Sequence, residues 1–316
     1  MMKNDDAVST VIAMMLILGI IVTLLAIYSA TYLPGLKQQS EIEHSRDVAN
    51  AFARFGSDIE YVISRSDSDI DYMISHNKSV RFSEPFSLGG GGVLLSPVRS
   101  SGLVTIGEER PLVNVTVTNT TQGKMTGNVS LANVSYVPSF TSWEPQGYLW
   151  EYGFVAVTKG NVTVPQSSQY TTISEARAGS DRFLESFIAM SPLENEIEIT
   201  VVNLTRKEDG YFITGSGIAT LGVNATASES YLKTDDGIVL VDEIIFENCT
   251  AGDAKVSEMM GEHLERLCTE MVKSLGGTCT YVPPNDSSPQ THKLMFNNGD
   301  KPTVTLRTVN VEVSVW

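Results

Sequence analysis

The most apolar part of the chain lies close to its N-terminus. No charged residue occurs from Ala7 to Leu36, and Val8–Leu33 is a run of 26 mostly apolar residues. A helix needs about 20 such residues to cross a bilayer, whereas the apolar region of a secretory signal peptide has about 7–15 and a buried core helix is typically shorter. The pattern therefore predicts a transmembrane helix over 8–33, preceded by a leader or cytoplasmic stub over 1–7.

The next segment, 34–66, has the pattern of an amphipathic stem helix. Pro34-Gly35 is expected to kink or break the helix, because proline lacks a backbone N–H and its ring clashes with the preceding turn. Apolar residues then recur at helical intervals, at Ile42, Ala49, Phe52, Phe55, Ile59 and Ile63. This stripe could pack on a neighbouring subunit, but one partner satisfies a single stripe, so we expect it to pack on the head of its own chain.

From Val80 to Phe246 the pattern changes to that of strands. Alternating or β-branched runs, separated by turn signals, occur at Leu112–Asn119, Asn128–Val137, Glu196–Leu204 and Gly237–Phe246. Short strands at this spacing are typical of antiparallel sandwiches or long curved sheets. The polar stretch Ser64–Ser79, which precedes them, is expected to be a loop.

The remaining residues, 247–316, predict a helix followed by strands. Asp253–Leu275 carries apolar residues along one face, Gly276-Gly277 ends it, and Thr303–Trp316 alternates as a long strand. We expect 80–246 to form a β-rich head and 247–316 a small helix-plus-strand subdomain. The predicted fold class is α+β, with a long N-terminal transmembrane and stem helix, a mainly antiparallel β extracellular head and one C-terminal helix.

The net charge and the amino-acid composition indicate where the protein is located. The 37 acidic residues outnumber the 22 basic residues, and the net charge is −15. Such a surface repels phosphate backbones, which argues against a nucleic-acid partner. Only 19% of the residues are charged, whereas Ser, Thr and Asn number 33, 28 and 16. That composition is typical of a secreted β-rich surface.

The chain contains ten Asn-x-Ser/Thr sequons where about three would arise by chance from its Asn, Ser and Thr content. This excess predicts an exported, N-glycosylated body, and hence a single-pass protein of the cell membrane with its N-terminus inside and its head extracellular. The candidate sites are Asn77, Asn114, Asn119, Asn128, Asn133, Asn161, Asn203, Asn224, Asn248 and Asn285. Asn119 and Asn161 adjoin turn signals and are better candidates than Asn203, which lies in or at the end of an apolar run.

The sequence DDAVSTVIA (residues 5–13), running directly into the apolar segment, resembles the N-terminus of archaeal type IV pilin-like proteins. The Gly89–Gly92 run and GYLWEYG (147–153) extend the likeness to a group of archaeal membrane-anchored surface proteins. The resemblance implies cleavage by a prepilin peptidase between Ala7 and Val8, and contacts with like subunits through the N-terminal helix. Asp6 stands where processed members usually carry a basic residue, and Ile12 where many bacterial pilins have glutamate. A permanently anchored pilin-like protein fits the sequence equally well.

No motif predicts chemistry. The four histidines form neither HExxH nor HxH, no GxSxG occurs, and Gly89–Gly92 lacks the helix and Lys-Ser/Thr of a phosphate-binding loop. We therefore expect no enzyme activity, cofactor or metal. A structural, pilin-like surface protein bound to the lipid bilayer is the first hypothesis, a bitopic binding or adhesion module the second, and an anchored ectoenzyme a remote third.

Three cysteines remain in a domain predicted to be exported and therefore oxidised. Cys268 lies on the apolar face of the last predicted helix, and Cys279 begins the segment that can fold back along it after the turn. We predict a Cys268–Cys279 disulfide with Cys249 free. Pairing of Cys249 with Cys279 is the alternative, followed by three free thiols.

Overall fold

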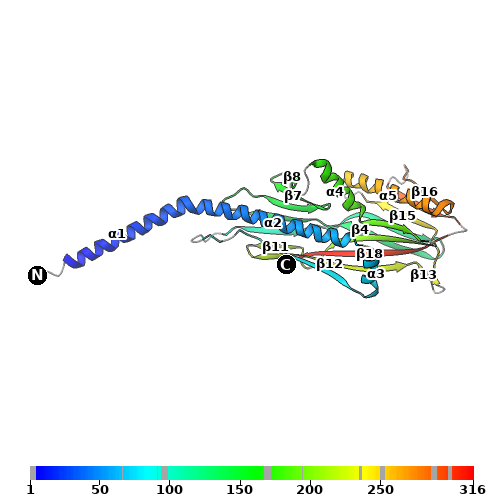
Figure 1. Ribbon diagram of the computed structural model, residues 1–316, viewed down its shortest axis with the longest axis horizontal. Coiled ribbons are helices and arrows are strands. Elements are labelled where there is room, and N and C mark those ends of the chain that lie inside the picture. The colour runs from blue at the N-terminus through cyan, green and yellow to red at the C-terminus, as the bar shows by residue number, and fades with distance from the viewer. Residues whose placement is uncertain are drawn as a thin grey trace.

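The protein is an elongated molecule in which a long helical rod projects from a β-rich head (Figure 1). In the computed structural model the described residues are 5–65, 67–90, 92–93, 99–166, 172–193, 195–234, 237–249, 253–285, 290–297 and 301–316. The architecture is α+β, with an N-terminal apolar helix, a mostly antiparallel β-rich body and a C-terminal helix.

The rod is helical from Asp5 to Ile63. Helix α1 (Asp5–Ile27) passes into a π-helical turn (Tyr28–Tyr32) and then into α2 (Leu33–Ile63). The expected break at Pro34-Gly35 does not occur, because Pro34 lies in the first turn of α2, where a missing N–H costs little. The rod changes direction near this point (Figure 1), as expected of a π-turn next to a proline.

The larger sheet has its strands in the order β1-β12-β18-β10-β4-β3-β15-β17-β16, with β9 also paired to β10. It is mixed, because β10 runs parallel to both β18 and β4, while the other pairs are antiparallel. The strands are β1 (Ser79–Ser87), β3 (Arg110–Asn119), β4 (Gly123–Leu131), β9 (Ile188–Pro192), β10 (Glu196–Arg206), β12 (Ile218–Tyr231), β15 (Glu243–Asn248), β16 (Cys279–Val282), β17 (Thr291–Phe296) and β18 (Thr303–Val315).

A second sheet, ordered β11-β2-β5-β6-β7-β8, is antiparallel throughout. Its strands are β2 (Ser101–Ile106), β5 (Val134–Ser139), β6 (Gly147–Glu151), β7 (Phe154–Lys159), β8 (Val162–Pro165) and β11 (Phe212–Gly215). A short ribbon pairs β13 (Lys233–Thr234) with β14 (Gly237–Ile238). Apolar side chains from both sheets, α2 and α5 form one buried cluster.

The C-terminal segment 247–316 contributes strands to the same sheet as the rest of the head. β18 lies between β12 and β10 in the larger sheet, and β16 and β17 extend the same sheet beyond β15. Strands from 80–246 and from 247–316, which the sequence analysis assigns to a head and a small subdomain, therefore share one sheet and one core.

Three helices accompany the sheets: α3 (Asp67–Ser75), α4 (Ile173–Glu185) and α5 (Ala254–Leu275), with a 3-10 turn at Gly276–Thr278. Helix α5 confirms the predicted C-terminal helix, and the Asp253 carboxylate accepts bonds from the N–H groups of its first turn.

The other two helices correct the sequence analysis. Helix α3 lies where the sequence analysis expected a loop. Its buried face consists of Ile70 and Met73 alone, and this apolar pattern is too short to be recognised in the sequence. Helix α4 lies inside the segment expected to hold only strands. Its Thr172-x-x-Glu175 start is a capping signal, and the Thr172 hydroxyl accepts a bond from the Glu175 N–H.

Candidate functional site

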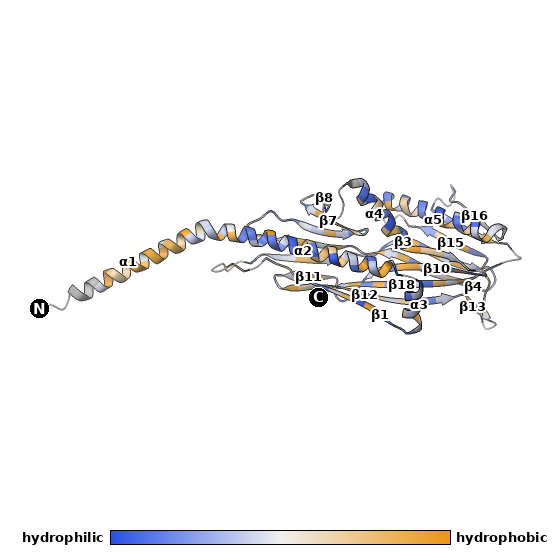
Figure 2. Ribbon diagram, viewed as in Figure 1, coloured by the Kyte–Doolittle hydropathy of each residue, from blue (hydrophilic) through white to orange (hydrophobic). Residues whose placement is uncertain are grey.

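The candidate site is the long helix and the place where it enters the head. In α1 the large apolar side chains from Val11 to Ile27 are exposed on every side, from 47% for Ile21 to 70% for Met14. Figure 2 shows mainly apolar residues along the coloured part of α1 and a mixed pattern along α2. The 23 residues of α1, at about 1.5 Å per residue, span about 35 Å. The hydrocarbon core of a bilayer is about 30 Å thick. Among the described residues this is the one helix long and apolar enough to cross a membrane.

Two polar side chains, one in α1 and one in the π-turn, have hydrogen-bond partners within the rod. The Thr23 hydroxyl donates to the Gly19 carbonyl at 2.8 Å, and the Ser29 hydroxyl to the Ala26 carbonyl at 3.1 Å. Such internal bonds suit a helix in hydrocarbon, where an unpaired donor is costly. The stacked rings of Tyr28 and Tyr32, with centroids 6.5 Å apart, directly follow the apolar run. Tyrosine is enriched at membrane–water interfaces.

The π-turn connects the exposed half of the rod with the buried half. The Leu33 N–H donates to the Tyr28 carbonyl, five residues back, so this turn holds one residue more than an α-helical turn. The wider turn rotates the helix face that follows it. Two turns later the side chains of α2 begin to be buried by the head.

Glu41 marks the start of this contact and is 3% exposed. Its Oε1 accepts bonds from the Thr141 N–H at 2.7 Å and the Thr141 hydroxyl at 3.0 Å, and its Oε2 accepts one from the Ser142 N–H at 2.9 Å. Three donors thus offset the desolvation of a buried carboxylate. The carboxylate holds the loop after β5 against α2.

A second pair of polar contacts lies one turn further along α2. Tyr136 donates its hydroxyl to the Leu88 carbonyl at 2.9 Å, so its oxygen accepts from His44 Nε2, also at 2.9 Å. The Ser45 hydroxyl is 2.8 Å from the Tyr148 hydroxyl. Burial lowers the pKa of His44, against the opposing effect of Asp47 and Glu41 nearby, and raises the pKa of Tyr136. His44 is therefore a neutral donor in this contact.

The glycine run packs close to the same place. A Cβ on Gly89 would lie 2.0 Å from the Ser100 carbonyl oxygen, and one on Gly90 would lie 2.8 Å from the Ser100 hydroxyl. Gly90 donates its N–H to that hydroxyl at 2.6 Å. Gly89 and Gly90 therefore allow close backbone packing beside α2, while Gly91 lies outside the described residues.

Further along, α2 is bound by apolar packing. Phe52, Phe55 and Ile59 are fully buried, and the rings of Phe55 and Trp150 meet edge to face with centroids 5.5 Å apart. A Cβ on Gly56 would lie 2.8 Å from Trp150 Nε1, so glycine allows the helix to approach β6 closely. The apolar stripe of α2 is thus covered by the head of the same chain.

The ten sequons differ in their accessibility. Asn77, Asn128, Asn161 and Asn285 are exposed, whereas Asn114, Asn119, Asn133, Asn203 and Asn224 are half-buried. Asn248 is buried, and its Nδ2 donates to the Ser257 carbonyl at 2.6 Å. The nitrogen that would carry a glycan is therefore engaged in a buried bond at Asn248, whereas the residues at the other four of these positions are exposed.

Asn119, one of the two preferred candidates, belongs to a polar cluster at the β3–β4 turn. Its Nδ2 donates to the Leu240 carbonyl at 2.7 Å, and its Oδ1 accepts from the Thr121 and Gln122 N–H groups at 2.9 Å. Both ends of the Asn119 side chain are therefore occupied by hydrogen bonds. Its position beside a turn made it a preferred candidate in the sequence analysis, but these bonds make it a poor glycan acceptor.

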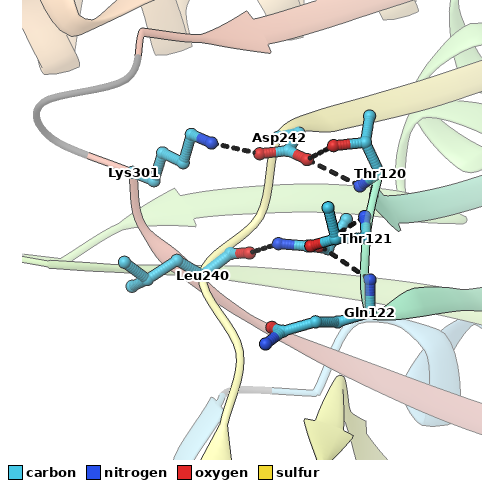
Figure 3. Close-up of polar contacts among 7 residues, drawn as sticks. Thr120, Thr121, Gln122, Leu240, Asp242 and Lys301 are labelled. Atoms are coloured by element: carbon cyan, nitrogen blue, oxygen red, sulfur yellow. Dashed lines mark hydrogen bonds and ion pairs between the residues drawn. The ribbon is translucent and has the colours of Figure 1, made fainter.

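Asp242 completes this cluster from the segment before β15. Its carboxylate pairs with Lys301 and accepts bonds at 2.6 Å from the N–H and hydroxyl of Thr120 (Figure 3). Bonds from Lys301 and Thr120 lower the pKa of Asp242 to about 2. The β3–β4 turn, the start of β15 and the segment before β18 are joined here, and every contact serves the fold.

The three cysteines are free thiols, so the predicted Cys268–Cys279 disulfide is not formed in the structure. Cys268 and Cys279 are both buried in the core, as their positions on the apolar face of α5 and at the start of β16 suggested. Burial raises the pKa of Cys268 to about 12 and that of Cys279 to about 11. The charge of nearby Cys279 also raises the pKa of Cys268, so the two thiols lie near each other, and the disulfide between them stays a prediction.

The predicted cleavage point lies in the first turn of α1, since the helix begins at Asp5 and the bond joins Ala7 to Val8. Within the described part of the chain no three His, Cys, Asp or Glu side chains lie close enough together to hold a metal ion. No protein-family model, no curated protein and no solved structure matches this chain.

Proposed function

We propose that this protein is a pilin-like, membrane-anchored surface protein whose N-terminal helix is embedded in the bilayer and whose β-rich head is extracellular. In this arrangement α1 spans the hydrocarbon, Tyr28 and Tyr32 lie at the interface, and α2 carries the anchor directly into the core of the head. The head is glycosylated at exposed sequons.

One observation carries the proposal. A single uninterrupted helix has apolar side chains on all sides over α1 and on one buried face over α2. Exposed apolar surface of this extent is unstable in water and marks contact with lipid or protein. The absence of any linker between the two parts supports a head that is rigidly attached to its anchor.

Charged substitutions in α1 test the anchor. Lysine near the centre of a membrane helix costs about 2.5–3.5 kcal/mol per residue, so Ile17→Lys, Ile20→Lys and Ile21→Lys together should release the protein from membranes in an alkaline carbonate wash. The matched control places three lysines at exposed apolar positions of the head, at Val137, Phe212 and Ile218. Release of both variants, or of neither, would contradict a single anchor in α1.

Assembly through the N-terminal helix is the more specific form of the proposal, and the resemblance to pilin-like proteins supports it. Cleavage between Ala7 and Val8 by a prepilin peptidase would free the end of α1 to pack among like helices. N-terminal sequencing of protein extracted from membranes tests this: Val8 as the first residue supports assembly, and a retained leader supports a bitopic binding module.

Glycosylation is tested by mass. The intact mass of the native protein should exceed the mass of the polypeptide. The substitutions Asn128→Gln and Asn161→Gln should each remove one glycan. Asn248→Asp is the control, since that amide is buried and should carry none. A native mass equal to that of the bare chain would contradict the proposed glycosylation and would weaken the argument for an extracellular head.

A further inference from the structure

The hairpin formed by β5 and β6 runs along α2 toward the anchor. Tyr136 of β5 bonds His44, and the loop after β5 bonds Glu41, one helical turn nearer to α1. Trp143 lies in this loop, next to Ser142, whose N–H donates to the Glu41 carboxylate at 2.9 Å. Its side chain is 37% exposed. The hairpin therefore holds an exposed tryptophan at the end of the head that faces the anchor.

The length of the rod places this end of the head close to the bilayer surface. The uncharged residues from Ala7 to Leu36 rise about 45 Å at about 1.5 Å each, and a bilayer with its headgroups is about 40–45 Å thick. When α1 spans the hydrocarbon, Lys37 is therefore level with the outer headgroups. Glu41 follows about 6 Å further along the helix. Because no linker separates α1 from α2, the loop that Glu41 binds is held at this height.

Two basic residues at this end have no acidic partner. Lys37 and Arg99 form no ion pair with another described residue. Arg99 is exposed, and the next residue, Ser100, accepts the Gly90 N–H close to α2. Lysine and arginine near a membrane surface are attracted to anionic lipids.

The acidic residues of the same segments are already bound. Glu41 is buried among three donors, and Glu43 accepts a bond from Gln39 at 3.0 Å. Glu144 pairs with Lys159 at 3.6 Å. This end of the head thus presents unpaired cations and an indole, although the whole chain has a net charge of −15. Phosphate headgroups suit the cations, and tryptophan is enriched at membrane–water interfaces.

We propose that the base of the head, formed by Lys37, Arg99 and Trp143, is a second membrane contact. Trp143 enters the headgroup layer, and the two cations pair with lipid phosphates. The occupant is the lipid surface because the continuous helix holds the base within one or two turns of it. The inference rests on the proposed anchor and adds to it a head that is seated on the membrane.

Fluorescence quenching from within the bilayer tests the contact. The full chain is reconstituted into vesicles of phosphatidylcholine and phosphatidylglycerol that contain a lipid with a nitroxide on its headgroup. We expect quenching of the wild-type chain, loss of most of that quenching in Trp143→Phe, and unchanged quenching in Trp316→Phe. Trp316 is the matched control: it is 57% exposed, but it bonds Thr220 at the level of Phe52, about 16 Å further along α2 than Glu41.

Charge substitutions test the two cations. Lys37→Gln with Arg99→Gln should weaken the contact about fivefold per residue in the anionic vesicles, and so reduce the quenching of Trp143. The control is Lys124→Gln with Lys273→Gln, two exposed lysines elsewhere on the head that also form no ion pair with a described residue. The control should leave the quenching unchanged, and equal reductions in the two double variants would overturn the proposal.

Flotation of the vesicles separates this contact from the anchor. A chain that does not float with the vesicles overturns the anchor and the contact with it. A chain that floats without quenching of Trp143 overturns the contact alone. Trp143 shielded from aqueous iodide but unquenched by the headgroup label would assign the base to a second copy of the chain, and equal loss of quenching in Trp143→Phe and Trp316→Phe would show a head lying on its side. Either result overturns the proposal.

Discussion

The two halves of the long helix have the same backbone and opposite surroundings. In α1 the large apolar side chains from Val11 to Ile27 cover the whole circumference and are exposed, whereas in α2 the apolar side chains occupy one face, which the head buries. The amount of apolar surface matters less here than its distribution. A helix that is apolar all round is satisfied only by an apolar medium or by several neighbouring helices, while a one-sided stripe needs a single protein face.

The junction between the halves is polar. Glu41, His44 and Ser45 are buried among hydrogen-bonding partners just where the exposed section ends. Charge-assisted and directional bonds fix one position of a helix more strictly than apolar contacts, which tolerate sliding. We infer that this polar layer sets the depth at which the head begins.

The largest effect should come from removing the exposed half. Deletion of residues 1–36 is expected to move the protein from the membrane fraction to the soluble fraction, because no other described helix can span a bilayer. The thermal unfolding midpoint of the head should change little, since α1 makes no contact with it that buries apolar side chains. A truncated head that stays in the pellet after high-salt and carbonate washes would contradict the comparison.

The second test removes one apolar side chain from each half. Phe55→Ala leaves a cavity beside Trp150 and should lower the free energy of unfolding of the head by about 3–5 kcal/mol. Leu18→Ala, in the exposed half, should leave that free energy unchanged. Denaturant unfolding followed by tryptophan fluorescence measures both. Equal losses in the two variants would show that α1 packs against the head.

The polar junction gives a smaller effect. Glu41→Gln replaces one acceptor oxygen by an NH₂ group that faces the Ser142 N–H, and should destabilise the head by about 2 kcal/mol. Hydrogen exchange at the Thr141 and Ser142 amides should become faster. Glu43→Gln changes an exposed carboxylate two residues away and is the control. Unchanged exchange at both amides would count against the role assigned to Glu41.

The weakest effect is a dependence on pH. Desolvation lowers the pKa of His44, His263 and His292 from the ordinary value of 6.5. Between that value and each lowered pKa the unfolded chain binds more protons than the folded head, so stability falls as the pH drops below about 6.5. Urea unfolding at pH 5–8 should show this slope, and His263→Gln should reduce it. A flat profile would contradict neutral buried histidines.

Local patterns predicted the helices well when the pattern was long. The apolar run at 8–33 and the amphipathic face at 253–275 needed only the spacing of apolar residues, and α1 and α5 follow them. Helix α3 was missed because two apolar residues carry its pattern, and α4 because its Thr172-x-x-Glu175 cap was the main local signal. Neither helix is long enough for the spacing of its apolar residues alone to distinguish it from a loop or a strand.

The residues at the junction could not be found in this way. Glu41 and His44 lie on the polar side of the sequence pattern, and their partners are Thr141, Ser142 and Tyr136, about a hundred residues away. A buried polar side chain has the same local sequence signature as an exposed one. Only the fold shows which of them has donors and acceptors around it.

The sequence by itself determined that the chain begins with a membrane-length apolar helix, continues as an amphipathic one and ends in a β-rich body. These properties depend on residues close together in the chain. The tertiary structure alone decided that β18 lies inside the larger sheet between β12 and β10, that Asn248 is buried while Asn128 is exposed, and that Cys268 and Cys279 are both in the core. Strand neighbours and burial depend on contacts between distant segments, and local spacing does not encode which segments meet.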